Sequence, residues 1–222
     1  MPRKAAISSG PDEMALRRGI IDAAQAMSRE GLSPVRSGNV SARLPGGMLI
    51  TPTGLAYEGL RPEQIVFVSD EGKTRPGSLK PSSEWHMHLA VYAAKPDAAA
   101  IVHCHSMNAT ALACAERSIP AFHYMVAVAG GTDIPLAAYA TFGTPELARA
   151  VTSALSKRNA ALLSHHGQIA CGSSLDAALD LAREVEVLAG QYCRFLQVGG
   201  DKLLGEDEMA RVLEKFGSYG QQ

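Results

Sequence analysis

Apolar residues recur along this chain with two spacings, and segments of the two kinds alternate from one end to the other. A spacing of three to four residues is typical of helices that bury one face, whereas short apolar runs between turn residues are typical of strands. The helical spacing predicts helices at residues 12–31, 82–94, 108–116, 144–157, 174–199 and 206–216. The apolar runs predict strands at 39–44, 48–51, 65–68, 98–105, 160–164 and 168–171.

Turn and capping residues mark several of these boundaries. A Pro-Gly-Gly turn at 45–47 joins the first two predicted strands as a hairpin. Thr144 followed by Pro145 is typical of the start of a helix. Because strands and helices interleave throughout, the sequence predicts a single α/β domain at 12–222, with helices covering a sheet, after a loose tail at 1–11.

The composition is that of an ordinary globular protein. Of the 222 residues, 46% are hydrophobic and 19% are charged, and the formal net charge is −1. These values exclude disorder for most of the chain and leave no strong basic field for a nucleic-acid partner. Apolar runs fall short of the roughly 20 residues that cross a membrane, and no signal peptide is recognisable. Four cysteines without a CxxC pair favour free thiols in a reducing cytoplasm.

The strongest chemical signal is the triplet His103-Cys104-His105 at the end of a predicted strand. Alternate side chains of a strand share a face, so His103 and His105 point the same way, about 7 Å apart along the backbone. Two imidazoles at that spacing can converge on one metal ion, although half-buried polar histidines are the simpler alternative. Cys104 points to the opposite face and is interpreted as a core thiol.

A second pair of histidines, His165 and His166, follows another predicted strand. Adjacent residues at a strand end face opposite ways, so one of the two can complete the metal site while the other packs elsewhere. Three histidines with an open position are typical of a catalytic zinc centre, and other divalent transition metals also accept imidazole.

Glu84 lies at the start of a predicted helix that Ser82 or Ser83 can cap. A carboxylate at this place is favoured by the helix dipole alone, which is the structural interpretation. The functional interpretation is a carboxylate that can bind or leave a metal and move protons.

Neutral hydrogen-bond donors cluster at three turns or element starts, and such groups commonly bind phosphate. Each of them alone is equally typical of a cap or turn. They are Gly38, Asn39, Thr53, Gly54, Ser82 and Ser83, together with Ser37. The absence of GxxxxGK[ST], GxGxxG and GxSxG patterns disfavours nucleotide sites and a nucleophilic serine.

Five short motifs occur in the order and spacing of a known family. They are S-G-N-V-S (37–41), T-P-T-G (51–54), S-S-E-W (82–85), H-C-H (103–105) and S-H-H-G (164–167). Together they resemble the class II aldolase/adducin family, most of all its members that cleave L-fuculose 1-phosphate. The resemblance covers essentially the whole chain after the first dozen residues.

The resemblance implies a mixed, largely antiparallel sheet flanked by helices, in a homotetramer with active sites at subunit interfaces. It assigns one Zn²⁺ per subunit to His103, His105 and His166, with Glu84 as an additional metal contact. Glu84 also matches the catalytic acid/base of the family.

Further positions carry over from the same resemblance. Tyr124 matches a catalytic tyrosine supplied by the neighbouring subunit, and Tyr219 matches one in the C-terminal tail. The phosphate-binding positions of the family fall on Gly38, Asn39, Thr53, Gly54, Ser82 and Ser83.

The activity that the resemblance implies is zinc-dependent retro-aldol cleavage of a ketose 1-phosphate to dihydroxyacetone phosphate and an aldehyde. The expected substrate is L-fuculose 1-phosphate or a 5-deoxy- or 5-methylthio-ribulose 1-phosphate. The alternatives on the same metal site are a pentulose-phosphate 4-epimerase, which typically has Asp where Glu84 stands, and a methylthioribulose-phosphate dehydratase. An adducin-like scaffold without activity is disfavoured because the metal histidines are all present.

Overall fold

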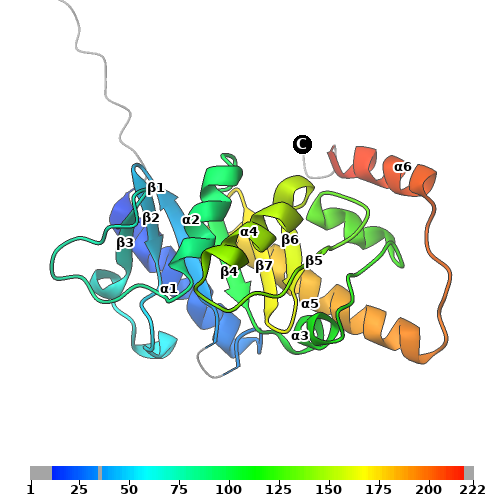
Figure 1. The fold of residues 1–222 in the computed structure, drawn as a ribbon, viewed down its shortest axis with the longest axis horizontal. Coiled ribbons are helices and arrows are strands. Elements are labelled where there is room, and N and C mark those ends of the chain that lie inside the picture. The colour runs from blue at the N-terminus through cyan, green and yellow to red at the C-terminus, as the bar shows by residue number, and fades with distance from the viewer. Residues whose placement is uncertain (1–11, 35–36, 218–222) are drawn as a thin grey trace, which may run out of the picture.

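The computed structural model describes residues 12–34 and 37–217, and within them a seven-stranded mixed sheet runs through the centre (Figure 1). Its strand order is β3-β2-β1-β4-β7-β6-β5, in which β5 pairs with β6 in parallel and the other neighbours are antiparallel. The strands are β1 (Asn39–Leu44), β2 (Gly47–Ile50), β3 (Val66–Ser69), β4 (Ala100–Cys104), β5 (Leu136–Ala137), β6 (Ala160–Leu163) and β7 (Gly167–Gly172). The expected mixed, largely antiparallel sheet is confirmed.

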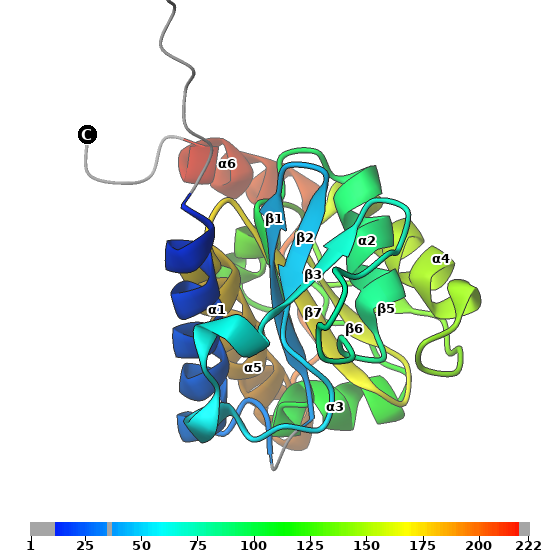
Figure 2. The same ribbon diagram turned by 90° about the vertical axis from the view of Figure 1, so that its left-hand side faces the viewer.

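Helices cover both faces of this sheet (Figure 2). The helices are α1 (Glu13–Arg29), α2 (Trp85–Ala94), α3 (Met107–Cys114), α4 (Pro145–Ala154), α5 (Leu175–Gln197) and α6 (Glu206–Gly217). Short 3₁₀ segments are η1 (Tyr57–Gly59), η2 (Pro62–Gln64), η3 (Tyr124–Ala129) and η4 (Leu155–Lys157). One core lies between the sheet and α1, α3 and α5, and a second lies between the other face and α2 and α4.

Strand alternation divides the apolar side chains between these two cores. On β4, Val102 and Cys104 belong to the core beneath α1 and α5, whereas Ile101 belongs to the core beneath α2. Cys104 therefore faces away from His103, as predicted, and burial raises the pKa of its thiol to about 12. All four cysteines, which lie within the described residues, are free thiols.

Three central strands, β1, β4 and β7, begin or end at the same end of the sheet. Asn39 begins β1 and pairs with His103 near the end of β4, and His103 pairs in turn with Ile169 of β7. The register therefore brings together segments that are far apart in the sequence. The turns and helix starts next to this end of the sheet carry most of the polar residues that the sequence analysis selected.

Several predicted boundaries differ from the structure. Ser82 and Ser83 do not cap α2; Glu84 is its N-cap residue, and Ser82 Oγ instead accepts the backbone N–H of Glu84 at 3.3 Å. The strand predicted at 98–105 ends at Cys104, so His105 lies just beyond it. The two-residue strand β5 was not predicted because two residues are too few to show a period.

Capping predictions at other helices are confirmed. The side chains of Thr144 and Ser174 accept backbone N–H bonds at the starts of α4 and α5. The predicted tail at 1–11 lies outside the described residues. Within the described part of the chain, no helix is both long and apolar enough to cross a membrane.

Candidate active site

Three imidazoles and one carboxylate converge at this end of the sheet, where β1 and β7 begin and β4 ends. His103 comes from β4, His105 from the segment after it, His166 from the connection between β6 and β7, and Glu84 from the start of α2. Their possible ligand atoms all lie within 4.8 Å of one another. The structure therefore brings together the complete set of predicted metal ligands.

The spacing of these atoms fits one small cation. Nε2 of His103 lies 3.1 Å from Nε2 of His105 and 3.1 Å from Oε2 of Glu84, and Oε1 of Glu84 lies 3.2 Å from Nε2 of His166. Two ligands that are each about 2.0–2.1 Å from a tetrahedral ion lie about 3.3 Å apart, close to these values. The three rings also surround a common point, since their centroids are 4.8–4.9 Å apart in each pair. The cluster could hold a divalent transition metal through three nitrogens and one oxygen.

A backbone carbonyl holds His103 in the orientation that a ligand needs. Nδ1 of His103 donates to the carbonyl oxygen of Gln168 at 2.8 Å, which leaves the lone pair of Nε2 facing the cluster. The side chain of Gln168 is itself fixed by bonds from its Nε2 to Ser106 Oγ and to the carbonyl oxygen of Ala182. The sequence analysis gave no role to Gln168, because its contribution depends on the pairing of β4 with β7.

The electrostatics of Glu84 also favour a positive charge at this point. Its side chain is buried, which raises its pKa, but the imidazoles of His103 and His166 lower the pKa by more, to well below its usual range. Among the described residues, the buried Oε1 of Glu84 has no hydrogen-bond donor other than Nε2 of His166 at 3.2 Å, which donates only if that ring carries a hydrogen on Nε2. A buried ionised carboxylate that faces the lone pairs of neutral imidazoles is costly without a cation between them, so this geometry supports the metal assignment. Burial and the neighbouring imidazoles lower the pKa of His105 to about 3, which keeps it neutral.

The histidine pair at 165–166 is divided by an unusual backbone conformation. His165 has φ 52°, in the left-handed region, and its side chain is 50% exposed, whereas that of His166 is 13% exposed and joins the cluster. Gly167 then allows a close approach: a Cβ at this position would lie 2.5 Å from the carbonyl oxygen of Cys104. The turn thus selects His166 over His165.

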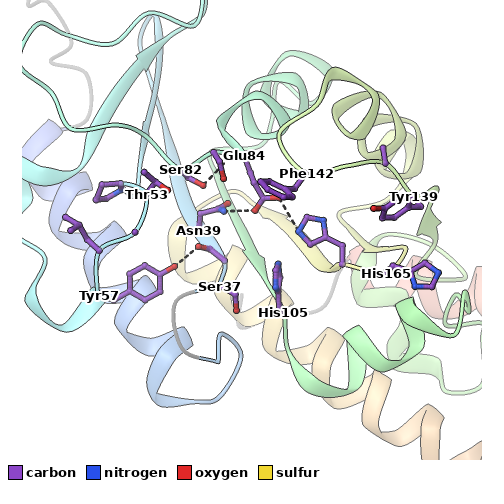
Figure 3. A pocket seen from close by; sticks show the side chains of 17 residues that line it. Ser37, Asn39, Thr53, Tyr57, Ser82, Glu84, His105, Tyr139, Phe142 and His165 are labelled. Atoms are coloured by element: carbon purple, nitrogen blue, oxygen red, sulfur yellow. Dashed lines mark hydrogen bonds and ion pairs between the residues drawn. The ribbon is translucent and has the colours of Figure 1, made fainter.

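A pocket of about 330 Å³ opens beside the cluster (Figure 3). His105, His166 and Glu84 line it, while His103 is fully buried behind them. All six predicted phosphate-binding residues also line it: Gly38, Asn39, Thr53, Gly54, Ser82 and Ser83. The structure therefore joins the predicted phosphate donors and the predicted metal ligands in one cavity.

Other pocket residues were not assigned a role from the sequence. Tyr139 and Phe142, both more than 60% exposed, line the pocket together with His165. Tyr57 also lines it, and its hydroxyl donates to the carbonyl oxygen of Gly38 at 2.6 Å. Burial raises the pKa of Tyr57 to about 12, so this donor stays protonated. Tyr139 and Phe142 belong to the segment Y-A-T-F-G-T (139–144), which also resembles the family but by itself indicates no role, and they join Tyr57 and His165 from other segments only in the folded chain.

Of the two remaining predicted catalytic residues, the structure describes only Tyr124. Tyr124 lies on η3 with 49% of its surface exposed and is not among the described residues that line the cavity. Its assignment to a neighbouring subunit stays a prediction. Tyr219 lies outside the described residues.

Comparison with known proteins places this arrangement in a family. The profile of the class II aldolase and adducin N-terminal domain matches residues 18–193. The 5-methylthioribulose-1-phosphate/5-deoxyribulose-1-phosphate aldolase of Rhodospirillum rubrum is 54% identical, over 93% of this chain and 93% of its own length. The L-fuculose phosphate aldolase of Escherichia coli K12 is 52% identical, over 92% of this chain and 95% of its own length.

A solved structure gives the same result in three dimensions. An L-fuculose 1-phosphate aldolase superposes with a TM-score of 0.88 at 36% identity, covering 91% of this chain and 96% of that one. These matches confirm the predicted fold and the predicted enzyme class, an aldolase-type lyase. The chain belongs to the class II aldolase and adducin family.

Proposed function

We propose that this protein cleaves a ketose 1-phosphate by a zinc-dependent retro-aldol reaction, giving dihydroxyacetone phosphate and an aldehyde. The observation that carries the proposal is the juxtaposition, in one pocket, of a His₃–Glu cluster and a wall of neutral phosphate donors. The relatives named above are aldolases of methylthioribulose, deoxyribulose and fuculose phosphates, which supports the same substrate class.

His103, His105 and His166 would hold the zinc, with Glu84 beside it. A zinc ion bound there supplies Lewis acidity that stabilises the negative charge developing on the substrate as its C3–C4 bond breaks. The burial of the carboxylate and of His103 strengthens such electrostatic effects, because the site excludes much of the water that would screen them.

Glu84 is the group that would carry the proton at C3. Cleavage of the C3–C4 bond leaves the electron pair on C3. Glu84, ionised before the reaction, would take up the proton that the C4 hydroxyl gives up and deliver it to C3, which completes dihydroxyacetone phosphate and leaves the carboxylate ionised again. The C4 hydroxyl must lose that proton as the aldehyde forms, and we propose that Tyr124 of a neighbouring subunit, together with Tyr219 of the tail, passes it on from the C4 oxygen. This assignment requires an oligomer, and we propose a homotetramer with interfacial active sites.

The phosphate would lie against the wall formed by the starts of β1 and α2 and the turn after β2. Gly54 has φ 74°, which turns the chain after Thr53, and Gly38 has φ 109°. A Cβ at Gly38 would lie 2.6 Å from the carbonyl oxygen of His103, so only glycine fits between this wall and the cluster. Ser83 is exposed at the same wall, where its hydroxyl can donate to a phosphate oxygen.

The proposed substrate is L-fuculose 1-phosphate or a 5-deoxy- or 5-methylthio-ribulose 1-phosphate. Each ends in a methyl or methylthio group, and the exposed rings of Tyr139 and Phe142 offer apolar surface to such a group. We propose a cytoplasmic location, as expected from the free thiols.

The test is to incubate the zinc-loaded protein with a panel of these ketose 1-phosphates and with a pentulose 5-phosphate. Release of dihydroxyacetone phosphate in equal amount with one identified aldehyde is the expected result. Epimerisation of the pentulose phosphate, or loss of water from the methylthio substrate without carbon–carbon cleavage, would contradict the proposal in favour of the epimerase or the dehydratase.

A further inference from the structure

A buried chain of polar side chains runs from Tyr92, in the last turn of α2, to the carboxylate of Glu84. Tyr92 and Ser41 are joined through their hydroxyls at 2.8 Å, Ser41 Oγ lies 2.7 Å from Nδ1 of His88, and Nε2 of His88 contacts Oδ1 of Asn39. Nδ2 of Asn39 then donates to Oε2 of Glu84 at 3.0 Å (Figure 3). His88 and Ser41 are fully buried, and Asn39 is 3% exposed.

The periods of a helix and a strand build this ladder. Glu84, His88 and Tyr92 are spaced by four residues, which places them on one side of α2. Asn39 and Ser41 are two residues apart on β1 and share the face that points toward α2, while Val40 between them belongs to the opposite core. His88 thus bridges two residues of the facing strand.

The direction of the hydrogen bonds that matter follows from the carboxylate. An ionised carboxylate only accepts, so the N–H of Asn39 must face Glu84 and its carbonyl oxygen must face His88. That oxygen also only accepts, so Nε2 of His88 carries the hydrogen. In a neutral imidazole Nδ1 then accepts from the Ser41 hydroxyl. Burial lowers the pKa of His88 to about 3, in agreement with a neutral ring.

We propose that His88, held as its Nε2–H tautomer, is a positioning residue that keeps the amide of Asn39 turned with its N–H toward Glu84. The proposal rests on the proposed role of Glu84 as proton carrier. In the other tautomer, Nε2 of His88 is an acceptor, and Asn39 could bond it only by turning its NH₂ group toward His88. That turn would bring the carbonyl oxygen of Asn39 against the Glu84 carboxylate, where two acceptors repel. The Asn39 bond holds Oε2 as an acceptor and so fixes how the carboxylate lies beside the imidazoles of His103 and His166.

This arrangement also restricts what Asn39 can offer a substrate. One of its two amide hydrogens is used by Glu84 and its oxygen is used by His88. The second amide hydrogen and the backbone remain for the predicted phosphate contact, which would tie the phosphate position to the carboxylate position through one side chain. A buried network whose donors and acceptors match along its length, as these do from Tyr92 to Glu84, favours a single arrangement.

The first test uses the unmodified protein. Nitrogen-15 NMR of histidine-labelled protein, with and without zinc, reports the tautomer and charge of His88, and a His88→Gln sample assigns its signals. A neutral ring with hydrogen on Nε2 between pH 5 and 8 is expected. Hydrogen on Nδ1, or a charged ring, would overturn the proposal. Because no substrate is needed, this result is independent of whether the protein is an aldolase.

The second test separates positioning from a merely structural role. His88→Phe, which removes both ring nitrogens, should lower kcat about 10- to 100-fold with KM and zinc content nearly unchanged. His88→Gln, whose amide can still donate to Asn39, should recover most of that loss. Met87→Leu, a buried substitution on the same helix, is the matched control and should leave kcat unchanged. If the Gln variant is as slow as the Phe variant although both are folded by thermal unfolding, His88 does not act through this bond.

A double substitution asks whether His88 acts through Asn39. If it does, His88→Phe combined with Asn39→Ala should be no slower than Asn39→Ala alone. Rate losses that multiply in the double variant would show independent effects and would overturn the proposal.

Discussion

Asn39 and His103 lie opposite each other in the antiparallel pairing of β1 with β4, and both reach Glu84 of α2. Oε2 of Glu84 accepts from Nδ2 of Asn39 at 3.0 Å and lies 3.1 Å from Nε2 of His103. These two paired strand residues therefore hold the carboxylate of Glu84, which is the N-cap residue of α2. A shift of β1 by one residue against β4 would turn Asn39 to the other core, away from Glu84 and His103, and would break up the site.

Replacing Glu84 by Gln should separate metal binding from proton transfer. The amide keeps the volume of the side chain but cannot carry the proton, so kcat should fall about 10²- to 10⁴-fold. Zinc bound per chain, measured by mass spectrometry, should stay the same because three imidazoles remain. Glu63→Gln, at an exposed position of η2, is the control and should retain full activity. An active Glu84→Gln enzyme would show that another group carries the proton.

The two adjacent histidines should respond in opposite ways. His166→Ala removes a ligand of the cluster and should weaken zinc binding by more than the roughly 10- to 100-fold that loss of an outer partner costs. His165→Ala changes an exposed ring of the same turn and should bind zinc normally. Chelator competition measures both affinities. Equal losses would mean that the turn, and not the ligand, is what the substitutions disturb.

The sequence predicted one part of this metal site and not another. The two-residue period of β4 correctly placed His103 and His105 together and Cys104 in the opposite core. The choice between His165 and His166 depends on the left-handed backbone of His165, which no residue type at that position reveals. The resemblance to the family selected His166, and the structure brings that residue to the cluster.

Contacts between distant segments were beyond the reach of local patterns. His88 is 49 residues from Asn39 and 47 from Ser41 in the sequence, and only the packing of α2 on β1 brings them together. From the sequence alone, a histidine inside a helix is indistinguishable from an ordinary core residue. The helix itself was predicted well, apart from its cap, because its apolar spacing is local.

The phosphate wall should affect substrate affinity more than chemistry. Ser83→Ala removes one hydroxyl that faces the pocket without touching the bond between Ser82 and the backbone of Glu84. A hydrogen bond to a charged group contributes about 1.5–3 kcal/mol, so KM should rise about tenfold or more with a small change in kcat. Steady-state kinetics decide this, with Ser156→Ala, which is remote from this pocket, as the control. A fall in kcat at constant KM would remove Ser83 from the phosphate site.

Burial of His88 predicts a pH dependence of stability in the metal-free protein. Its folded-state pKa is lowered from 6.5 to about 3, so the unfolded chain takes up a proton below pH 6.5 that the folded chain does not. The contribution of His88 to the free energy of unfolding is therefore fully present above pH 6.5. As the pH falls toward 3, that contribution decreases by about 1.4 kcal/mol per pH unit. Urea unfolding at pH 4.5–6.5 measures the free energy of unfolding, and its increase with pH should be correspondingly smaller for His88→Gln than for the unmodified protein. Identical slopes in both proteins would mean that His88 titrates normally.

The central claim is that three imidazoles beside Glu84 hold a single zinc ion in the pocket. Anomalous diffraction at the zinc edge, from crystals of the zinc-loaded protein, tests it most directly. We predict one peak per chain, about 2.0–2.1 Å from the Nε2 atoms of His103, His105 and His166. A peak elsewhere, or no peak at these three atoms in fully loaded protein, would contradict the account.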